Sequence, residues 1–337
     1  MKASVISIDL AKNIFQLCAL NRAKKVICNV KVGREDLLNQ LRQFEPTLVA
    51  MEACYSAHPW GRAIQELGHE VKLIPPIKVK PFVQGNKNDR NDALAIAEAC
   101  LRPGMHFVPV KSLSQQDIQS LLRIRDRVIR QRTALVNQIR GLLAEYHIIC
   151  PQTISKLRNF LPSIIEDPGK PLTVAARAFF DDLLVELKCL DRSVKYYTDQ
   201  AHELLKGNDD YLRIQQIPGI GPMVASTTLA AAGDAQQFKN GRQFSAWIGI
   251  PPRHHSSGDK CHLGGMSKRG NCQLRRMLIH GARAVINWCH KKTDKLSRWV
   301  QSLLVSKPVC KVIVALANKL ARILWVVLAK KENYQSA

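Results

Sequence analysis

The chain has 337 residues, 46% of them hydrophobic, so it can bury two or three separate cores. It carries 50 Lys and Arg against 27 Asp and Glu, a formal charge of +23, which favours DNA or RNA as the partner over an anionic membrane surface. No secretory signal is predicted, because the short N-terminal apolar run carries Asp9, and we expect a cytoplasmic protein.

Residues 1–110 predict an α/β domain in which strand and helix signals alternate. Three short β-rich runs separated by short turns favour an antiparallel meander, and later runs alternate with helical patterns. In chain order, strands are expected at 4–10, 15–20 and 25–32, a helix at 34–44, a strand at 47–53, a helix at 60–68, a strand at 70–76 and a last helix from Asp89. This βββ-α-β-α-β-α order predicts a mixed sheet.

Four carboxylates occur where these elements begin or end. Asp9 lies in the first strand, Glu52 closes the fourth, and Asp89 and Asp92 begin the last helix in an i, i+3 relation that places both on one face. An unpaired carboxylate in an apolar strand is costly, which favours a functional role for Asp9. Taken alone, Asp89 reads equally well as a helix N-cap and Asp92 as a first-turn acid.

In an RNase H-like fold, the first strand, the fourth strand and this helix meet at one edge of the sheet. Carboxylates gathered there would repel one another unless a divalent cation joined them, and oxygen ligands suit Mg²⁺, with Mn²⁺ as an alternative. Two such ions can stabilise the attacking and leaving oxygens in phosphodiester chemistry. Actin-like sugar kinases also begin with a strand, an Asp and a hairpin, but there a glycine normally follows the Asp. The sequence "IDLAKN" after the first strand has none.

Residues 111–208 predict a helical coiled-coil arm. Leu121, Val128, Leu135 and Leu142 recur every seven residues, the spacing of a coiled-coil seam. A second apolar run with 3–4 spacing covers 183–204, so an antiparallel helical hairpin or a dimerising arm is expected. The arginines between 123 and 140 are interpreted equally well as a nucleic-acid contact or as a solvated face.

Residues 209–337 predict a mainly α-helical C-terminal domain. Its opening segment, "IPGIGP", places Gly219 and Gly221 between two helical patterns, as in a helix-hairpin-helix turn whose backbone N–H groups approach a phosphate. A polar loop follows at 251–271, and then two amphipathic helices. The apolar stretch 309–329 is interrupted by Lys311, Lys319 and Arg322, which predicts an amphipathic helix and not a membrane span.

The polar loop carries Ser256 and Ser257 in a strongly cationic segment. A serine that attacks a phosphodiester needs cationic stabilisation of the pentacoordinate state and activation of its hydroxyl by a histidine or a metal. An ordinary phosphate-binding turn is the alternative interpretation. The cations expected to contact nucleic acid are Arg253, Lys260, Lys268, Arg269, Arg275 and Arg276.

Ten cysteines occur without any C-x-x-C pair, which indicates reduced thiols. Histidines and cysteines cluster loosely between His254 and His290, but without the two close pairs of a usual zinc site, so zinc is a minor alternative.

These motifs together resemble the DEDD-type insertion-sequence transposases, which are also described as bridge-RNA-guided serine recombinases and are related to pilin-type DNA invertases. The resemblance rests on Asp9, "MEA" with Glu52, "KNDRNDA" with Asp89 and Asp92, "IPGIGP", and "SSG…GGMSKRGNCQLRR". It covers nearly the whole chain, and its motifs occur in the family's order.

The resemblance implies an RNase H-like (RuvC-like) domain whose carboxylates bind Mg²⁺ and a C-terminal transposase domain whose serine forms a covalent 5′-phosphoserine link. It implies excision and integration of a mobile element, with donor and target DNA chosen by pairing to a structured guide RNA. It also implies dimers that pair into tetramers, with a site shared between the acidic domain of one subunit and the serine of another. Ser256 is the favoured nucleophile, with Ser257 the close alternative.

Two rival functions remain. A Holliday-junction-type endonuclease would need the four carboxylates but no serine nucleophile. A non-catalytic DNA- or RNA-binding protein would need neither.

Overall fold

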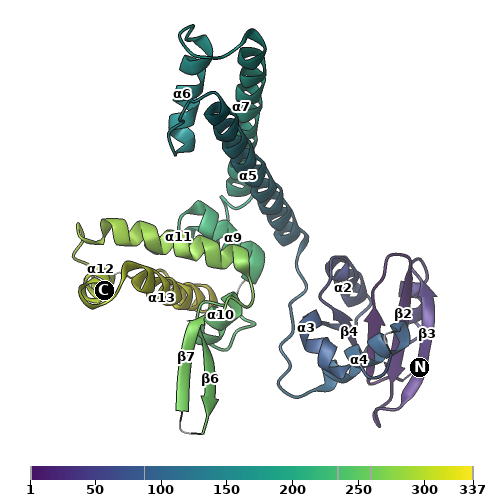
Figure 1. Ribbon diagram of the computed structural model, residues 1–337. Coiled ribbons are helices and arrows are strands. Elements are labelled where there is room, and N and C mark those ends of the chain that lie inside the picture. Colours follow the sequence, from purple (N-terminus) through teal and green to yellow (C-terminus); the bar gives the residue numbers. More distant parts are fainter. Residues whose placement is uncertain (1, 87, 234, 259, 336–337) are drawn as a thin grey trace. The chain divides into compact units, whose positions relative to one another are not determined.

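The computed structural model describes residues 2–86, 88–233, 235–258 and 260–335 and divides into two compact units, 1–112 and 113–337 (Figure 1). The first unit holds all the predicted carboxylates, and the second holds both predicted serines. The predicted division near residue 208 between an arm and a C-terminal domain falls within the second unit and remains a prediction.

The first unit is built on a five-stranded sheet with the strand order β3-β2-β1-β4-β5, and the mixed sheet predicted from the sequence is confirmed. β1 pairs antiparallel with β2, and β2 with β3, whereas β1, β4 and β5 are parallel. Its strands are β1 (Val5–Asp9), β2 (Ile14–Leu20), β3 (Val26–Gly33), β4 (Leu48–Glu52) and β5 (Glu70–Ile74).

Helices cover both faces of this sheet. Leu37 of α1 and Ile64 of α2 are buried against one face, while the small side chains of α4, such as Ala93 and Ala97, are buried against the other. The helices are α1 (Leu37–Leu41), α2 (Ala57–Glu66), α3 (Pro76–Val79), the 3-10 turn η1 (Lys80–Phe82) and α4 (Asp89–Leu101). The short α3 and η1 were not predicted, because Pro75, Pro76 and Pro81 in and beside them obscure any helical pattern.

The second unit begins with a long antiparallel helical pair, α5 (Leu113–Glu145) and α7 (Val174–Glu203), joined through α6 (Ile154–Glu166). Arg125 Nε donates to Thr198 Oγ1 at 2.6 Å and Arg132 Nη1 to Asp191 Oδ1 at 3.0 Å, so the residue numbers run in opposite directions. Of the predicted heptad, Val128 and Leu135 are buried. The hairpin is therefore confirmed, while a regular coiled coil remains a prediction.

The rest of the second unit is a helical bundle that carries one β-hairpin. Its elements are α8 (Asp209–Gln215), α9 (Pro222–Ala232), α10 (Gly241–Ile248), β6 (Pro252–Ser257), β7 (Lys260–Met266), α11 (Cys272–Cys289), α12 (Lys295–Ser306) and α13 (Val309–Lys330). The prediction of a loop around Ser256 is wrong, because β6 and β7 pair antiparallel there.

The helix α13 is long and apolar enough to cross a membrane by length and composition alone. Half of its most apolar window is buried inside the protein, where it forms part of the core with α10 and α11. Lys311 and Arg322 are exposed and Lys319 is half-buried, which agrees with the amphipathic helix predicted from the sequence.

Candidate active site and nucleic-acid interface

Asp9 and Glu52 lie at the carboxyl ends of two neighbouring parallel strands. β1 and β4 pair in a register that ends with Ile8 opposite Met51, so the two acids are the next residues along each strand. Both side chains are half-buried. Because strand ends leave room beside the sheet for a ligand, this placement is one in which carboxylates can act jointly.

The first turn of α4 is fixed against the same sheet by polar contacts. The side chain of Asn88 accepts a hydrogen bond from the Asn91 N–H at 2.9 Å and so caps the helix. Ser7 Oγ donates to the Ala93 carbonyl at 2.5 Å, and Asn29 Nδ2 donates to the Arg90 carbonyl at 3.1 Å. These contacts hold α4 on β1 and β3 at the level of Asp92.

The electrostatics of Glu52 indicate which carboxylates influence one another. Its pKa is raised, first by burial and then by the negative charges of Asp9 and Asp92. Asp92 is half-buried, whereas Asp89 is exposed at the start of α4. Asp9 and Asp92 are therefore the two predicted acids whose charges act on Glu52, and Asp89 lies exposed at the start of α4.

The donor chemistry of this cluster fits a hard divalent cation, since oxygen ligands of like charge are what such an ion joins. In the described part of the chain, however, no three His, Cys, Asp or Glu residues lie close enough to hold a metal ion as placed. Among the described residues between His254 and His290, the histidines and cysteines likewise form no group of three that could hold a metal ion.

The two candidate serines are consecutive residues of β6 and lie on opposite faces of the β6–β7 hairpin. Ser256 Oγ lies 2.8 Å from His254 Nε2, which in turn lies 3.0 Å from Cys261 Sγ. Ser256 and Cys261 are cross-strand partners, as are His255 and His262. Because side chains alternate along a strand, Ser257 shares the opposite face of the hairpin with His255. Both serines are exposed.

The six predicted phosphate-binding cations fall into two groups. Arg253, Lys260, Lys268 and Arg269 are exposed, and none makes a salt bridge within the described residues. In contrast, Arg275 Nη1 donates to the Ile248 carbonyl at 2.8 Å, and Arg276 pairs with Asp126 of α5. The last two arginines therefore already serve the packing of the unit.

The two glycines of "IPGIGP" have different surroundings. Gly219 has φ +82°, and a Cβ there would lie 2.7 Å from the Gly281 carbonyl oxygen of α11. Gly221 is the N-cap of α9 and faces open space. The first glycine is thus needed for packing, and only the second is free to let a phosphate approach the start of α9.

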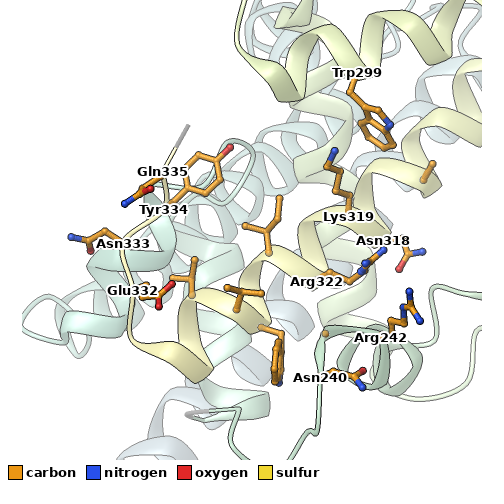
Figure 2. A pocket seen from close by; sticks show the side chains of 16 residues that line it. Asn240, Arg242, Trp299, Asn318, Lys319, Arg322, Glu332, Asn333, Tyr334 and Gln335 are labelled. Atoms are coloured by element: carbon orange, nitrogen blue, oxygen red, sulfur yellow. The ribbon is translucent and has the colours of Figure 1, made fainter. Parts of the chain in front are cut away.

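The second unit also has a groove that was not predicted from the sequence. This groove of about 1300 Å³ is lined by cationic and aromatic side chains from α10, α12, α13 and the residues after α13 (Figure 2). Its only sequence signal was the interruption of an apolar helix by Lys319 and Arg322.

Comparison with known proteins identifies the chain's relatives. A family model described as "Transposase IS116/IS110/IS902 family" matches residues 211–298, and a DEDD transposase model of the IS110 group matches residues 6–148. A probable family 20 transposase of Pseudomonas aeruginosa is 45% identical over 336 residues, covering 99% of each chain. The transposase for insertion sequence element IS1111A of Coxiella burnetii is 43% identical, covering 98% of this chain and 91% of its own.

A more distant relative is the pilin gene-inverting protein of Moraxella bovis, 21% identical with 99% of this chain and 98% of the relative covered. The matched regions include the strands and helix that carry the four acids, as well as the hairpin that carries the serines. The chain therefore belongs to the IS110/IS116 family of insertion-sequence transposases, a family of enzymes that cut and rejoin DNA.

Proposed function

We propose that this transposase excises and integrates an insertion sequence by using a serine nucleophile together with carboxylates that bind Mg²⁺. The observation that carries the proposal is the contact between Ser256 Oγ and His254 Nε2 on an exposed hairpin that also carries exposed cations. An exposed serine with a histidine as its base is the arrangement from which a hydroxyl attacks an external phosphodiester.

The proposed cleavage step is an in-line displacement at phosphorus. Ser256 Oγ forms a bond to the phosphorus, the bond from phosphorus to the 3′ oxygen breaks, and the strand is left joined through a 5′-phosphoserine. The hydroxyl proton of Ser256 passes to His254 Nε2, and the 3′ oxygen takes up a proton from solvent water and leaves as a hydroxyl. Rejoining reverses these bonds with a different 3′ hydroxyl as the attacking group.

Exposed cations beside the serine would stabilise the charge that develops on the phosphoryl oxygens. Arg253 and Lys260 flank the serines on the same hairpin, and Lys268 and Arg269 follow it. The N–H groups at Gly221 and the start of α9 are further phosphate donors. These contacts bind the backbone and carry no base specificity.

In the RNase H-like first unit, Asp9, Glu52, Asp89 and Asp92 would hold Mg²⁺ or Mn²⁺. The raised pKa of Glu52 supports this assignment, because carboxylates brought together at a cost in free energy are a common feature of metal and catalytic sites. Bound Mg²⁺ would neutralise phosphate charge at the reacting strand. Before metal binds, the role of these residues is to present oxygen ligands at one edge of the sheet.

The choice of DNA site is proposed to come from an element-encoded guide RNA that pairs with donor and target DNA. The net charge of +23 supports simultaneous binding of DNA and RNA, because both carry negatively charged phosphates. The working assembly is proposed to be a dimer that pairs into a tetramer, with the acidic unit of one subunit acting with the serine of another. Such an enzyme acts where the chromosome is accessible, in the cytoplasm of a prokaryote.

The decisive experiment is to trap the covalent intermediate. The protein is expressed with its native flanking DNA, co-purified RNA is sequenced, and the complex is given a nicked DNA substrate that prevents rejoining. We expect a denaturant-resistant protein–DNA adduct whose mass maps to a peptide containing Ser256. Ser256→Ala should abolish the adduct, and Ser257→Ala should retain it.

Each other outcome changes one part of the proposal. An adduct that is lost only with Ser257→Ala moves the nucleophile to the neighbouring serine. Cleavage without any adduct supports the Holliday-junction-type endonuclease, and four-way junctions are then the substrate to test. Heterogeneous RNA, or none, in the purified complex removes the guide from the proposal.

A further inference from the structure

The groove in the second unit is lined by parts of four segments that are distant in the sequence. It lies between the N-terminus of α10, helix α12, one face of α13 and the residues that follow α13, with a volume of about 1300 Å³ (Figure 2). Pockets for single drug-sized ligands are typically about 300–1,000 Å³. The groove therefore suits an extended ligand better than a small metabolite.

The cations of the groove come from two helices that meet closely. Arg242 extends from the first turn of α10, and Lys319 and Arg322 extend from α13 (Figure 2). Gly241 permits this approach, since a Cβ there would lie 3.0 Å from Arg322 Cα. Within the described residues, neither Arg242 nor Arg322 forms a salt bridge, and Glu332 is the one carboxylate of the lining. With three cations and one carboxylate among these lining residues, the groove carries a net positive charge.

Aromatic rings form the second half of the lining. The half-buried Trp299 of α12 lies beside Lys319, whose Nζ is 4.1 Å from the ring centroid. Trp325 of α13 is fixed by its indole Nε1–H, which donates to the Phe238 carbonyl at 3.1 Å. Tyr334, after α13, contributes a third ring. Rings held beside cations are a stacking surface for flat, negatively charged polymers.

We propose that this groove binds a single-stranded segment of nucleic acid, with bases stacked on Trp299 and Tyr334 and phosphates paired with Arg242 and Arg322. A duplex hides the faces of its bases and could use only the cations, whereas a single strand uses both halves of the lining. An acidic peptide would satisfy the cations but would leave three aromatic rings without a matching partner. The single strand can be RNA or displaced DNA, because both present bases and phosphates.

This inference does not depend on the serine or the carboxylates, because none of them lines the groove. It adds a site for nucleic acid that is separate from the cationic hairpin. Success or failure of the covalent-intermediate experiment therefore leaves it untouched.

The test measures binding of fluorescein-labelled oligo-dT, oligo-U and a DNA duplex to the full chain, with probes of about 15 nucleotides to match common site sizes. The variant is Arg242→Glu with Arg322→Glu. The matched control is Arg298→Glu with Lys311→Glu, which makes the same charge change at exposed positions of α12 and α13 outside the groove. Thermal unfolding of both variants confirms that they fold.

We expect the groove variant to weaken binding of at least one single strand by about tenfold or more, and the control by about twofold or less. Its salt slope should fall by about 1.4, the value for two lost single-strand phosphate contacts. Tyr334→Ala should weaken the same probe by about tenfold through loss of stacking. The preferred probe, oligo-U or oligo-dT, then identifies RNA or displaced DNA as the ligand.

The proposal is overturned if the groove variant binds both single strands as well as the control does. It is also overturned if duplex binding falls as much as single-strand binding, since that result would show general electrostatic attraction. As a second measurement, crosslinking of oligonucleotides that contain 4-thiouridine or 4-thiothymidine should label peptides with Trp299 or Tyr334. Labelling confined to the β6–β7 hairpin would contradict the assignment.

Discussion

The turn between α8 and α9 packs directly on α11 through two glycines, Gly219 and Gly281. A Cβ on Gly219 would lie 2.7 Å from the Gly281 carbonyl oxygen, and Gly219 has a φ of +82° that an L side chain rarely adopts. The glycine pair therefore allows two backbones to touch, and the turn is held in place by the bundle. A motif that resembles a phosphate-binding hairpin in the sequence thus has a packing role at one of its two glycines.

Gly219→Ala should destabilise the second unit by about 2 kcal/mol or more, because the substitution adds backbone strain and a clash with the Gly281 carbonyl. Chemical denaturation followed by circular dichroism measures the change. Gly281→Ala should have an effect of similar size, since its Cβ would meet the Gly219 backbone.

Gly221→Ala is the matched control, because it lies two residues away with φ −81° and nothing near a built Cβ. It should keep the stability of the wild type within about 0.5 kcal/mol. Equal stability of the Gly219 and Gly221 variants would show that the close approach to α11 does not constrain the turn.

Glu52→Gln should raise the melting temperature at pH 7 by a few degrees, on the order expected for a small gain in a domain of this size. The folded-state pKa of Glu52 is raised by burial and by Asp9 and Asp92, so the native state holds the proton more tightly than the unfolded chain. The stabilisation that protonated Glu52 contributes to the folded state is therefore fully present below pH 4.5. It is lost as the pH rises through the raised pKa of Glu52. Scanning calorimetry at pH 4 and pH 7 measures the difference, which should vanish at the lower pH.

Magnesium should make the wild type more stable at pH 7 than the Glu52→Gln variant. Added Mg²⁺ is expected to stabilise the wild type through the carboxylate cluster and to have a much smaller effect on Glu52→Gln. Glu35→Gln, at an exposed position of the same unit, should behave as the wild type in both conditions. If Glu52→Gln gained as much from Mg²⁺ as the wild type did, Glu52 would not be a ligand.

The sequence predicts the strands and the longer helices of the first unit well because each of them carries a local signal, which the short α3 and η1 lack. Short apolar runs and turn residues mark the five strands, and the neighbouring places of Asp9 and Glu52 follow from parallel pairing of β1 with β4. The gathering of Asp92 with Glu52 depends on how α4 packs through Ser7 and Ala93. Only an analogy with a known fold could predict that packing from the sequence.

The β6–β7 hairpin and the groove could not be predicted in the same way. Every residue of β6 is exposed, so neither face shows the apolar alternation by which a strand is recognised, and polar composition alone indicates a loop. The groove joins Arg242, Trp299 and Lys319 from three helices. Each of these residues has an ordinary helical neighbourhood in the sequence, and only tertiary packing brings them together.

Asp191→Asn should destabilise the helical pair by about 1–3 kcal/mol, because one carboxylate joins arginines of α5 and α6 to α7. Asp191 accepts from Arg158 Nε at 2.6 Å and Nη2 at 2.5 Å, and from Arg132 Nη1 at 3.0 Å. Burial alone would raise its pKa, but the hydrogen bonds from Arg158 and Arg132 outweigh burial and lower it. The stabilisation that ionised Asp191 contributes is present above pH 3.8, the ordinary pKa of an Asp side chain. It is lost as the pH falls through the lowered pKa of Asp191.

Urea denaturation at neutral pH measures the Asp191→Asn effect, with Asp199→Asn on the same helix as its control. Among the residues that the structure describes, Asp199 forms a salt bridge only with the exposed Lys195, so its substitution should cost about 0.5 kcal/mol or less. Similar losses for the two variants would mean that the three-residue network adds nothing beyond a surface ion pair.

His254→Ala should slow formation of the covalent protein–DNA adduct by about 10²–10⁴-fold, because the hydroxyl of Ser256 then loses the acceptor of its proton. Single-turnover assays with saturating nicked substrate measure the rate, and binding assays with the same DNA should show little change. His255→Ala is the control, since His255 pairs with His262 on the other face of the hairpin and carries a similar exposed imidazole. Its rate should stay within about threefold of the wild type. A reversal of the two effects would place the base beside Ser257, because alternation along β6 puts His255 on the same face as that serine.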